Sequence, residues 1–466
     1  MNHRHALSVL LIGLLIGAQI ADAASCLVGE LLESVGRDHI LVGASMSDAV
    51  AQSAPFDLRY VYLSGGLFDG AAPCASCASG CSSGGQSCAN SNPNGCAWWG
   101  CWQYDQDPPG AYVRGFVAGE HSSARIPMLT YYEILQSSGA SEGAGEVAAA
   151  ADVALMGRYL ADWRFVLQSI GQSTAFLHIE PDFWGFAEQV DADPHAIPAA
   201  VASANPTDCA GQENSIAGLG RCMIAMVRKY APNARVGLHG SGWATRIDVL
   251  LNASPTLDVA GEADKLGAFL VGCGADQADF VVVDASDRDA GYYASIGRDS
   301  WWDATDTTRP DFAQALDWAH ALAERVGRPV VWWQLPVGNL SLPNVSSQWQ
   351  DNRVDYFFAH TAELAASHGA AMAFGAGAGG QTTPSTDGGN LIARTQAYAA
   401  SGGQAPCPEP DAGLAGLLSL ATLWLLTRWA AANSHRLALS STATRGTVRS
   451  GAPGDPAAAA ERAGAG

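Results

Sequence analysis

Residues 174–186 read TAFLHIEPDFWGF, an apolar run that ends in a carboxylate, a proline, a second carboxylate and a group of aromatic residues. With a period of two, Leu177 and Ile179 lie on one face of a strand while His178 and Glu180 lie on the other. Only the carboxyl end of this strand is polar, and on one face alone. The pattern predicts a buried strand that delivers Glu180, as a catalytic acid, to a pocket.

Similar runs with strand character recur along the chain. They cover 39–45, 58–65, 126–133, 174–182, 234–241, 279–287, 329–338 and 370–377. Apolar residues at helical spacing lie between several of these runs, over 153–170, 216–230, 312–326 and 354–364. Strands that alternate with helices predict a parallel sheet, and eight repeats predict an α/β fold, the (β/α)8 or TIM barrel, over 24–405. An open doubly wound sheet is the alternative, but no glycine-rich phosphate loop follows the first strand.

The interval between the second and third strands, 67–125, shows no clear helix and is rich in cysteine. Its cysteines are Cys74, Cys77, Cys81, Cys88, Cys96 and Cys101. Their spacing is irregular and no histidine is near, which favours a disulfide-rich insertion over a zinc site. Cys209 and Cys222 form a plausible further pair. The chain has 11 cysteines, an odd number, so at least one is unpaired or pairs outside the chain.

The amino-terminal residues 1–23 predict a secretory signal peptide. A basic start is followed by an apolar stretch over 6–20 and by Ala-Asp-Ala at 21–23, a small-x-small cleavage site. The apolar stretch is shorter than the roughly 20 residues of a membrane span. Lipidation at Cys26 is a lesser alternative, because the leucine of a lipoprotein signal is missing. Export would permit disulfides.

A second targeting feature lies near the other end. Residues 406–410 read PCPEP, and Asp411, an apolar run over 412–426 and Arg428 follow. This segment, 406–433, resembles the PEP-CTERM class of bacterial sorting signals, although basic residues are sparse and 429–466 continue where such signals normally stop. The resemblance implies a protein held at a bacterial membrane or cell wall, as a plain stop-transfer helix also would. The tail, 434–466, is predicted to be disordered.

The net charge of −20 and the lack of a basic patch outside the tail argue against nucleic acid as a partner. No cofactor and no resident metal is expected, and the oligomeric state stays open.

In a (β/α)8 barrel the chemistry lies where the strands end, so the residues expected to face the barrel there are candidates. Strand by strand they are Tyr62 and Ser64, Thr130 and Tyr132, His178 and Glu180, His239 and Ser241, Asp284, and Trp332 and Gln334. Two carboxylates, Glu180 and Asp284, thus project inward from the fourth and sixth strands. Cleavage of a glycosidic bond needs such a pair, one to protonate the leaving oxygen and one to attack or to activate water.

Other residues near the strand ends are candidates for binding a sugar. Aromatic rings can stack on the apolar faces of sugar rings, and histidines can bind hydroxyl groups or tune an acid. The candidates are Tyr62, Tyr132, His178, Asp182, Trp184, His239, Trp243, Trp332 and Gln334. Further aromatic residues, Trp98, Trp99, Trp102 and Tyr104, lie in the insertion and form a second predicted aromatic surface.

This plan resembles the glycoside hydrolases of the (β/α)8 type. In their largest clan an Asn-Glu pair ends the fourth strand and a second Glu ends the seventh, where this chain has Ile179-Glu180 and Gln334. Other glycosidase barrels place acidic pairs on the fourth and sixth strands, which suits Glu180 and Asp284. The resemblance implies a secreted or surface-anchored hydrolase of a poly- or oligosaccharide, with Glu180 as general acid/base and Asp284 as nucleophile or second base.

Two other functions remain open at this point. A metal-dependent barrel hydrolase would use His178, Glu180, His239 and Asp284 as ligands, although the first strand lacks a His-x-His. A non-catalytic carbohydrate-binding surface protein would account for Gln334 in place of a carboxylate. Glu180 could also be structural and pair with Arg59 or Arg235.

Overall fold

The computed structural model describes residues 27–68, 98–103, 105 and 108–406. The predicted signal peptide, most of the cysteine-rich insertion, the sorting segment from residue 407 onward and the tail lie outside the described residues. These features therefore stay predictions. In the part of the chain that is described, no helix is both long and apolar enough to span a membrane.

Eight parallel strands form a closed barrel in the order of the sequence, and β8 pairs with β1. The strands are β1 (Leu41–Ala44), β2 (Leu58–Leu63), β3 (Ile126–Tyr131), β4 (Phe176–Ile179), β5 (Arg235–Gly240), β6 (Phe280–Asp284), β7 (Val330–Leu335) and β8 (Gly369–Phe374). Each lies within one of the predicted runs, except that β8 starts one residue earlier. The predicted (β/α)8 barrel is confirmed.

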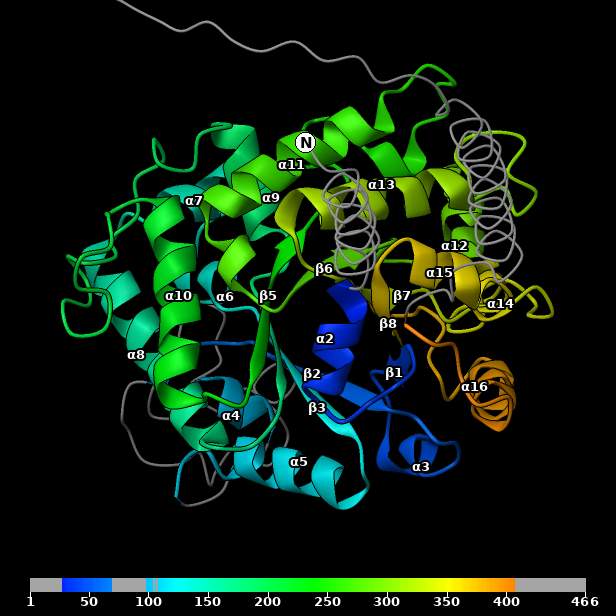
Figure 1. The fold of residues 1–466 in the computed structure, drawn as a ribbon, viewed down its shortest axis with the longest axis horizontal. Coiled ribbons are helices and arrows are strands. Elements are labelled where there is room, and N and C mark those ends of the chain that lie inside the picture. Colours follow the sequence, from blue (N-terminus) through cyan, green and yellow to red (C-terminus); the bar gives the residue numbers. More distant parts are fainter. Residues whose placement is uncertain (1–26, 69–97, 104, 106–107, 407–466) are drawn as a thin grey trace, which may run out of the picture. The chain divides into compact units, whose positions relative to one another are not determined.

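Helices surround the strands (Figure 1). The longer ones are α5 (Ala111–Ser122), α8 (Val153–Ile170), α9 (Phe183–Val190), α10 (Ile216–Tyr230), α11 (Val259–Gly272), α13 (Phe312–Val326) and α16 (Asn390–Ala400). Shorter ones are α2 (Leu27–Glu33), α3 (Asp48–Ala51), α4 (Trp99–Trp102), α6 (Ile134–Ser138), α7 (Ala144–Ala149), α12 (Ala290–Ser295), α14 (Arg353–Ala359) and α15 (Thr361–Ala366). Single 3-10 turns are η1 (Val249–Leu251) and η2 (Ala275–Gln277).

Helix α8 shows how local sequence sets an element that later positions the site. Asp152 caps it by accepting hydrogen bonds from the amides of Ala154 (2.8 Å) and Leu155 (2.9 Å), and it ends at Gly171, which has a φ of +61°. Its buried face includes Met156, Tyr159, Leu160, Asp162, Trp163, Val166, Leu167 and Ile170. The apolar part of this stripe packs on the barrel, and its two polar members, Tyr159 and Asp162, meet carboxyl groups and tyrosines behind β3 and β4.

Helix α5 corrects the expectation that 67–125 holds no helix. Its buried face is thin, because Val113 and Val117 are followed by a buried carboxylate, Glu120. Glu120 is held by Arg59 at 3.0 Å and by Arg125 at 2.5 Å. The helical pattern of α5 is therefore weak in the sequence, because only two aliphatic residues mark its buried face and an ion-paired carboxylate takes the next buried position.

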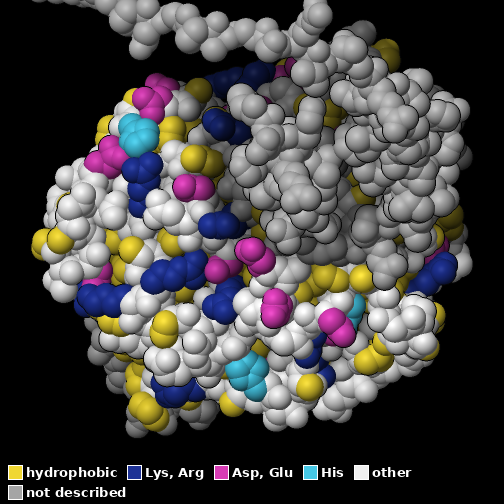
Figure 2. Space-filling view, in the orientation of Figure 1, with side chains coloured by type: hydrophobic (Ala, Val, Ile, Leu, Met, Phe, Trp, Pro, Cys, Tyr) yellow, Lys and Arg dark blue, Asp and Glu magenta, His cyan; other side chains and the backbone are white. Residues whose placement is uncertain are grey.

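The amino end of the barrel is covered by α2. Arg235, at the start of β5, donates from Nε to Ser34 Oγ (2.9 Å) and from Nη2 to the Ser34 carbonyl (3.3 Å). Figure 2 shows the molecule from the side on which α2 lies in Figure 1. On the coloured part of this face, acidic and basic side chains are interspersed and do not gather into one basic patch.

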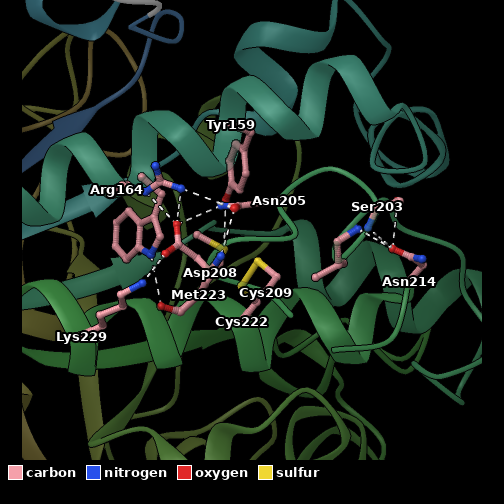
Figure 3. The surroundings of a disulfide bond; sticks show 12 residues. Tyr159, Arg164, Ser203, Asn205, Asp208, Cys209, Asn214, Cys222, Met223 and Lys229 are labelled. Carbon is pink, nitrogen blue, oxygen red and sulfur yellow. Dashed lines mark hydrogen bonds and ion pairs between the residues drawn. A yellow bond between two sulfur atoms is a disulfide. The ribbon is translucent and has the colours of Figure 1, made fainter. Parts of the chain in front are cut away.

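A disulfide joins Cys209 to Cys222, as the sequence predicts (Figure 3). It fixes the loop before α10 onto that helix. Next to it, Asp208 bonds Arg164 of α8 and, at 2.8 Å, Lys229 of α10. Burial alone would raise the pKa of Asp208, but the hydrogen bonds from Lys229 and its other partners hold it well below the usual range. Cys273 is a buried free cysteine, and Cys101 lies in α4.

Candidate active site

A cavity of about 630 Å³ opens at the carboxyl ends of the strands. Its polar lining includes Ser64, Gln136, Glu142, Asp182, Asp248, Asp284, Ser286, Asp287, Arg298 and Gln334. Its aromatic lining includes Tyr62, Tyr132, Phe186, Trp243, Tyr293 and Trp333. The position is the one expected for the chemistry of a (β/α)8 barrel, and both the size and the mixture of a few polar groups with aromatic walls suit a small-molecule or sugar site.

The residues after β4 decide which carboxylate reaches this cavity. Both Glu180 and Asp182 have a positive φ, +49° and +66°, which is unusual outside glycine. These backbone turns end the alternation of side chains along the strand, so the side chain of Glu180 does not point to the same side as that of His178. Asp182 lines the cavity instead, next to Pro181. Backbone strain of this kind persists only where the surrounding structure holds it, and it clusters at functional sites.

The expected inward position of Glu180 is therefore wrong. Its carboxyl is fully buried and Oε1 accepts hydrogen bonds from the amides of Glu133 (3.0 Å) and Ile134 (3.2 Å) and from Tyr159 Oη of α8 (2.9 Å). The alternative partners Arg59 and Arg235 bond other groups. Burial raises the pKa of Glu180 to about 8. This carboxyl belongs to the packing between β3, β4 and α8, and it is not among the residues that line the cavity.

Two further carboxyl groups, those of Asp162 and Glu133, are buried near Glu180. Asp162 accepts from Tyr131 Oη (2.7 Å) and from Trp99 Nε1 (3.0 Å), and burial raises its pKa to about 7. Glu133 accepts from the Gly66 amide (2.9 Å), and burial, followed by the charges of Asp162 and Glu180, raises its pKa well above the usual range. Protonated carboxyls are compatible with such a site, because burial disfavours the ionised form and none of the three carboxyls forms an ion pair with another described residue.

Asp182 has the properties of an acid in the cavity. It precedes α9, yet its side chain makes no capping hydrogen bond to that helix, so the carboxyl is not used for structure there. Burial raises its pKa to about 7, His239 lowers the pKa and the charge of Asp284 raises it again. At neutral pH a substantial share of Asp182 therefore carries a proton, which is the state that a general acid needs.

Asp284 ends β6 and lines the cavity, as predicted. His239 Nε2 lies 3.3 Å from Asp284 Oδ1, although the two are not aligned as a hydrogen bond. Behind His239 a chain of polar groups crosses the barrel: His239 Nδ1 lies 3.1 Å from His178 Nε2, and His178 Nδ1 lies 3.2 Å from Thr130 Oγ1.

One assignment of protons satisfies the two hydrogen bonds that join Thr130, His178 and His239. Burial, followed by the neighbouring His239, lowers the pKa of His178 well below its usual range, so this imidazole is neutral. If Thr130 donates to His178 Nδ1, His178 Nε2–H donates to His239 Nδ1 and His239 presents Nε2–H to Asp284. The two histidines, predicted to bind sugar, thus lie beneath the cavity, fully buried, and orient the partner of Asp284.

The seventh strand shows a second break in alternation. Trp332, expected to face the cavity, is fully buried and its ring lies 5.4 Å from that of Phe357 in α14, on the helix side. Trp333 points into the barrel, with ring centroids 4.6 Å from His178 and 5.6 Å from Tyr62. A register irregularity follows Trp332.

That irregularity also places Gln334. The residue has a φ of +54° and lines the cavity beside Trp333, so two consecutive side chains of β7 reach the same space. Gln334 accepts a hydrogen bond from the Tyr62 hydroxyl. Gly377 permits this arrangement, because a Cβ there would lie 2.2 Å from Gln334 Nε2.

The remaining predicted sugar-binding residues divide into two groups. Tyr62, Tyr132 and Trp243 line the cavity as expected, and the ring of Trp243 lies 4.6 Å from that of Phe186. Trp184 does not, since it is buried and donates from Nε1 to the Ile179 carbonyl at 3.0 Å.

The insertion also differs from the expected aromatic surface in the part that is described. Trp98 and Trp99 are fully buried, and Trp98 packs 4.9 Å from Phe68. They form part of the core against α8 instead of a face for sugar. Trp102 and Tyr104 belong to residues whose side chains are not described.

Several cavity residues were not among the site residues predicted from the sequence. These are Gln136, Glu142, Asp248, Asp287, Tyr293, Arg298 and Trp333. Asp287 follows β6 directly in the run DASD, and the Tyr293 hydroxyl donates to it. Its position just after a strand end could have indicated that it lines the cavity. Glu142, Asp248 and Arg298 lie in loops, and the positions of loops do not follow from counting strands.

The four residues considered from the sequence as metal ligands do not come together in one site. Glu180 lies away from Asp284, and His178 and His239 use facing nitrogens for each other. These four side chains therefore do not converge on one point.

Protein-family models give no match to the chain, and a search of curated proteins likewise gives none. Among solved structures, an endo-beta-1,4-mannanase from Cellulomonas fimi is similar at 13% identity, over 81% of this chain and 75% of its own, with a TM-score of 0.45. The GH26 endo-beta-1,4-mannanase catalytic domain of Bacillus sp. JAMB-750 is 11% identical. The match covers 82% of this chain and 90% of that domain, with a TM-score of 0.42.

The endoglucanase Cel6 from Mycobacterium tuberculosis matches 48% of this chain and 56% of its own length, at 15% identity and a TM-score of 0.27. These three structures are glycoside hydrolases, and their identities and TM-scores are low.

Proposed function

We propose that the chain is a glycoside hydrolase in which Asp182 and Asp284 are the catalytic carboxylates. The observation that carries the proposal is that these two acids, from the ends of β4 and β6, line one cavity with tyrosine and tryptophan side chains. Their environments differ, because burial raises the pKa of Asp182 to about 7 while Asp284 lies beside His239. A pair of carboxyl groups in different environments is what glycosidic bond cleavage needs.

Asp182 is the general acid in this mechanism. Its proton passes to the glycosidic oxygen as the bond to the anomeric carbon breaks, which leaves Asp182 as a carboxylate. Asp284 acts on the other side of the sugar, either by taking a proton from the attacking water or by attacking the anomeric carbon itself. In both cases His239 is a polar neighbour of Asp284, with Nε2 3.3 Å from Oδ1. The anomer that is released first distinguishes the two routes.

The other cavity residues would bind and orient the sugar. Trp243 and Trp333 offer ring faces for the apolar side of a pyranose, and Gln334 and Tyr62 offer hydrogen-bonding groups that are already ordered by each other. A poly- or oligosaccharide is the substrate class that fits an open cavity of about 630 Å³ at the end of a barrel.

The charge of the lining narrows this class. Glu142, Asp182, Asp248, Asp284 and Asp287 bring acidic groups to the cavity, and Arg298 brings a basic one. A polymer of uronic acids would meet repulsion here, whereas neutral sugars or protonated amino sugars would not. We therefore propose a neutral or amino sugar polymer as the substrate.

Export of the enzyme is also part of the proposal. The Cys209–Cys222 disulfide supports it, since structural disulfides persist mainly in oxidising compartments. Attachment to a bacterial membrane or cell wall through 406–433 rests on the sequence resemblance alone.

The test is a screen of the purified chain on neutral, amino and acidic polysaccharides, with release of reducing ends as the readout. Asp182→Asn and Asp284→Asn should each remove activity while the melting temperature and circular dichroism stay close to wild type. Asp276→Asn, at an exposed position on the η2 turn, is the matched control. Glycan binding by a folded wild-type chain without turnover of any polymer would instead favour a carbohydrate-binding protein.

A further inference from the structure

Three side chains with metal-binding atoms meet away from the cavity, near the amino ends of the strands. His320 and Glu324 lie four residues apart on α13, so they share one face of the helix. His368 immediately precedes β8, and its carbonyl accepts a hydrogen bond from the amide of Val330 at the start of β7. One candidate ligand atom from each of the three residues lies within 4.8 Å of the other two.

The ring of His320 is oriented as in many metal sites. Its Nδ1 lies 3.1 Å from the carbonyl oxygen of Ala366 at the end of α15. A carbonyl can only accept, so Nδ1 carries the hydrogen and Nε2 is left with a free lone pair. A backbone carbonyl behind a histidine fixes the tautomer and the ring plane for a ligand on the opposite nitrogen.

His368 supplies the second unsatisfied nitrogen. Its side chain is 10% exposed, and Nε2 lies 2.7 Å from Glu324 Oε1 without the alignment of a hydrogen bond, so it has no hydrogen-bond partner in the structure. The ring is stacked on that of His320, with centroids 4.8 Å apart and planes 11° apart. The backbone holds it there with a φ of +61°, an unusual conformation for histidine.

We propose that His320, Glu324 and His368 bind one divalent transition-metal ion. Two imidazole nitrogens and a carboxylate oxygen are a donor set that suits Zn²⁺ and its neighbours, with a remaining position for water. Ligand atoms of a tetrahedral Zn²⁺ site lie about 3.3 Å apart, as follows from bonds of about 2 Å. Rotation of the exposed Glu324 side chain, with a small shift of His320 that keeps its Nδ1 contact with the Ala366 carbonyl, would bring the three atoms to that spacing.

The ion would join α13 to the loop that leads into β8. Since the catalytic candidates lie at the carboxyl ends of the strands and this cluster lies at the amino ends, the ion would not touch the substrate. Its expected effect is on stability, because an ion that binds only the folded chain raises the free energy of unfolding by mass action. This inference does not depend on the proposed hydrolase activity.

The experiment uses the untagged full chain, treated with a chelator and dialysed, with Zn²⁺ as the probe. Isothermal titration calorimetry should show one site in the wild type, and the melting temperature should rise by a few degrees with excess Zn²⁺. His320→Gln, Glu324→Gln and His368→Asn should each weaken binding at least tenfold and remove most of the rise. Asparagine is chosen at 368 because it tolerates a positive φ.

A matched control is available in His195, an exposed histidine whose Nδ1 lies 2.6 Å from Glu213 Oε1 and which, among the described residues, belongs to no group of three metal-binding side chains. His195→Gln should leave Zn²⁺ binding and the melting temperature as in wild type. Equal Zn²⁺ uptake by the wild type and by all three site variants would overturn the proposal. So would loss of the site in His195→Gln, or a wild type that takes up no Zn²⁺. The exposed His320→Gln and Glu324→Gln changes keep the test valid if His368→Asn fails to fold.

Discussion

At the residue scale, the carboxyl of Asp182 sets the pH dependence that the mechanism predicts. Its pKa is raised to about 7, and only its protonated form can donate to the leaving oxygen. Activity should therefore be lost as the pH rises through about 7, with kcat/KM falling tenfold per unit above it. A pH–rate profile between pH 4 and 9 measures this limb, and an alkaline limb well above pH 8.5 would contradict the assignment.

If Asp182 is the general acid, its removal should affect two kinds of substrate differently. Asp182→Asn should reduce kcat on a polysaccharide by about 10²–10⁴-fold, the usual contribution of a general acid. The loss should be much smaller on a glycoside with an activated phenolate leaving group, because that group departs without protonation. Asp284→Asn should lose activity on both substrates. Equal losses for the two variants on both substrates would mean that Asp182 is not the acid.

Glu180 is expected to affect stability instead of turnover. Its pKa is about 8 in the fold against 4.5 ordinarily, so the folded chain binds this proton more tightly than the unfolded chain. The contribution is complete below about pH 4.5 and is lost as the pH rises through about 8. Glu180→Gln is neutral throughout and keeps an acceptor for Tyr159, so its stability should fall less over this range, by up to a few kcal/mol at about 1.4 kcal/mol per pKa unit.

Urea unfolding at pH 5, 7 and 8.5 measures the difference. Asp162 and Glu133 add a pH dependence of the same sign and remain in the variant, so the slope should be reduced and not abolished. Glu33→Gln, at an exposed position in α2, serves as the control. Parallel pH curves for wild type and Glu180→Gln would show that Glu180 carries no such shift.

The sequence indicates carboxylates at the end of the fourth strand, but it does not show which of them reaches the cavity. Alternation of side chains is a property of extended backbone, and it stops where φ becomes positive, at Glu180. Glu180 and Asp182 are two positions apart, so the strand pattern assigns both side chains to one face. The backbone turn between them decides which carboxyl group enters the cavity. The inward position of Asp284 follows the sequence pattern because Asp284 belongs to β6 itself, where the alternation is regular.

At the scale of elements, the sequence predicted those strands and helices whose buried faces consist of apolar residues alone. The strands are short and buried, so their apolar runs stand out, as does the helix α8. Prediction failed where a polar group replaces part of the apolar stripe, as Glu120 does in α5. It also failed at the irregularity of β7, which places Trp333 and Gln334 together in the cavity. Neither feature changes the hydrophobic period enough to be read from one sequence.

The disulfide gives a prediction for one element and its loop. Cys209 and Cys222 are 13 residues apart, and closing a loop of that size stabilises a fold by about 3 kcal/mol in the chain-entropy account. The double variant Cys209→Ser/Cys222→Ser should lose about that much in the free energy of unfolding. Wild-type protein in excess dithiothreitol should match it, and dithiothreitol should leave the double variant unchanged. An undiminished stability in both would mean that the ion pairs of Asp208 suffice to hold the loop.

At the scale of the whole molecule, the two ends of the barrel differ in chemistry. The carboxyl end holds the cavity with its acidic and aromatic lining, and the amino end holds α2 and the His320–Glu324–His368 cluster. The chain as a whole carries a net charge of −20. An anionic polymer would therefore meet repulsion from acidic side chains both as it approaches the molecule and within the cavity, which agrees with the proposed neutral or amino sugar substrate.

This field predicts how the reaction depends on salt. At low ionic strength kcat/KM for a neutral or amino sugar oligosaccharide should exceed that for a uronic acid oligosaccharide by at least tenfold, and roughly 0.5 M NaCl should narrow the gap because it screens exposed charges. Glu142→Gln, which removes a carboxylate from the rim of the cavity, should narrow it at low salt as well. Asp276→Asn removes the same charge from the opposite end of a strand and should not. A preference for the uronic acid substrate that survives in high salt would rule out charge as the basis of selection and would point to specific recognition of the acid by Arg298.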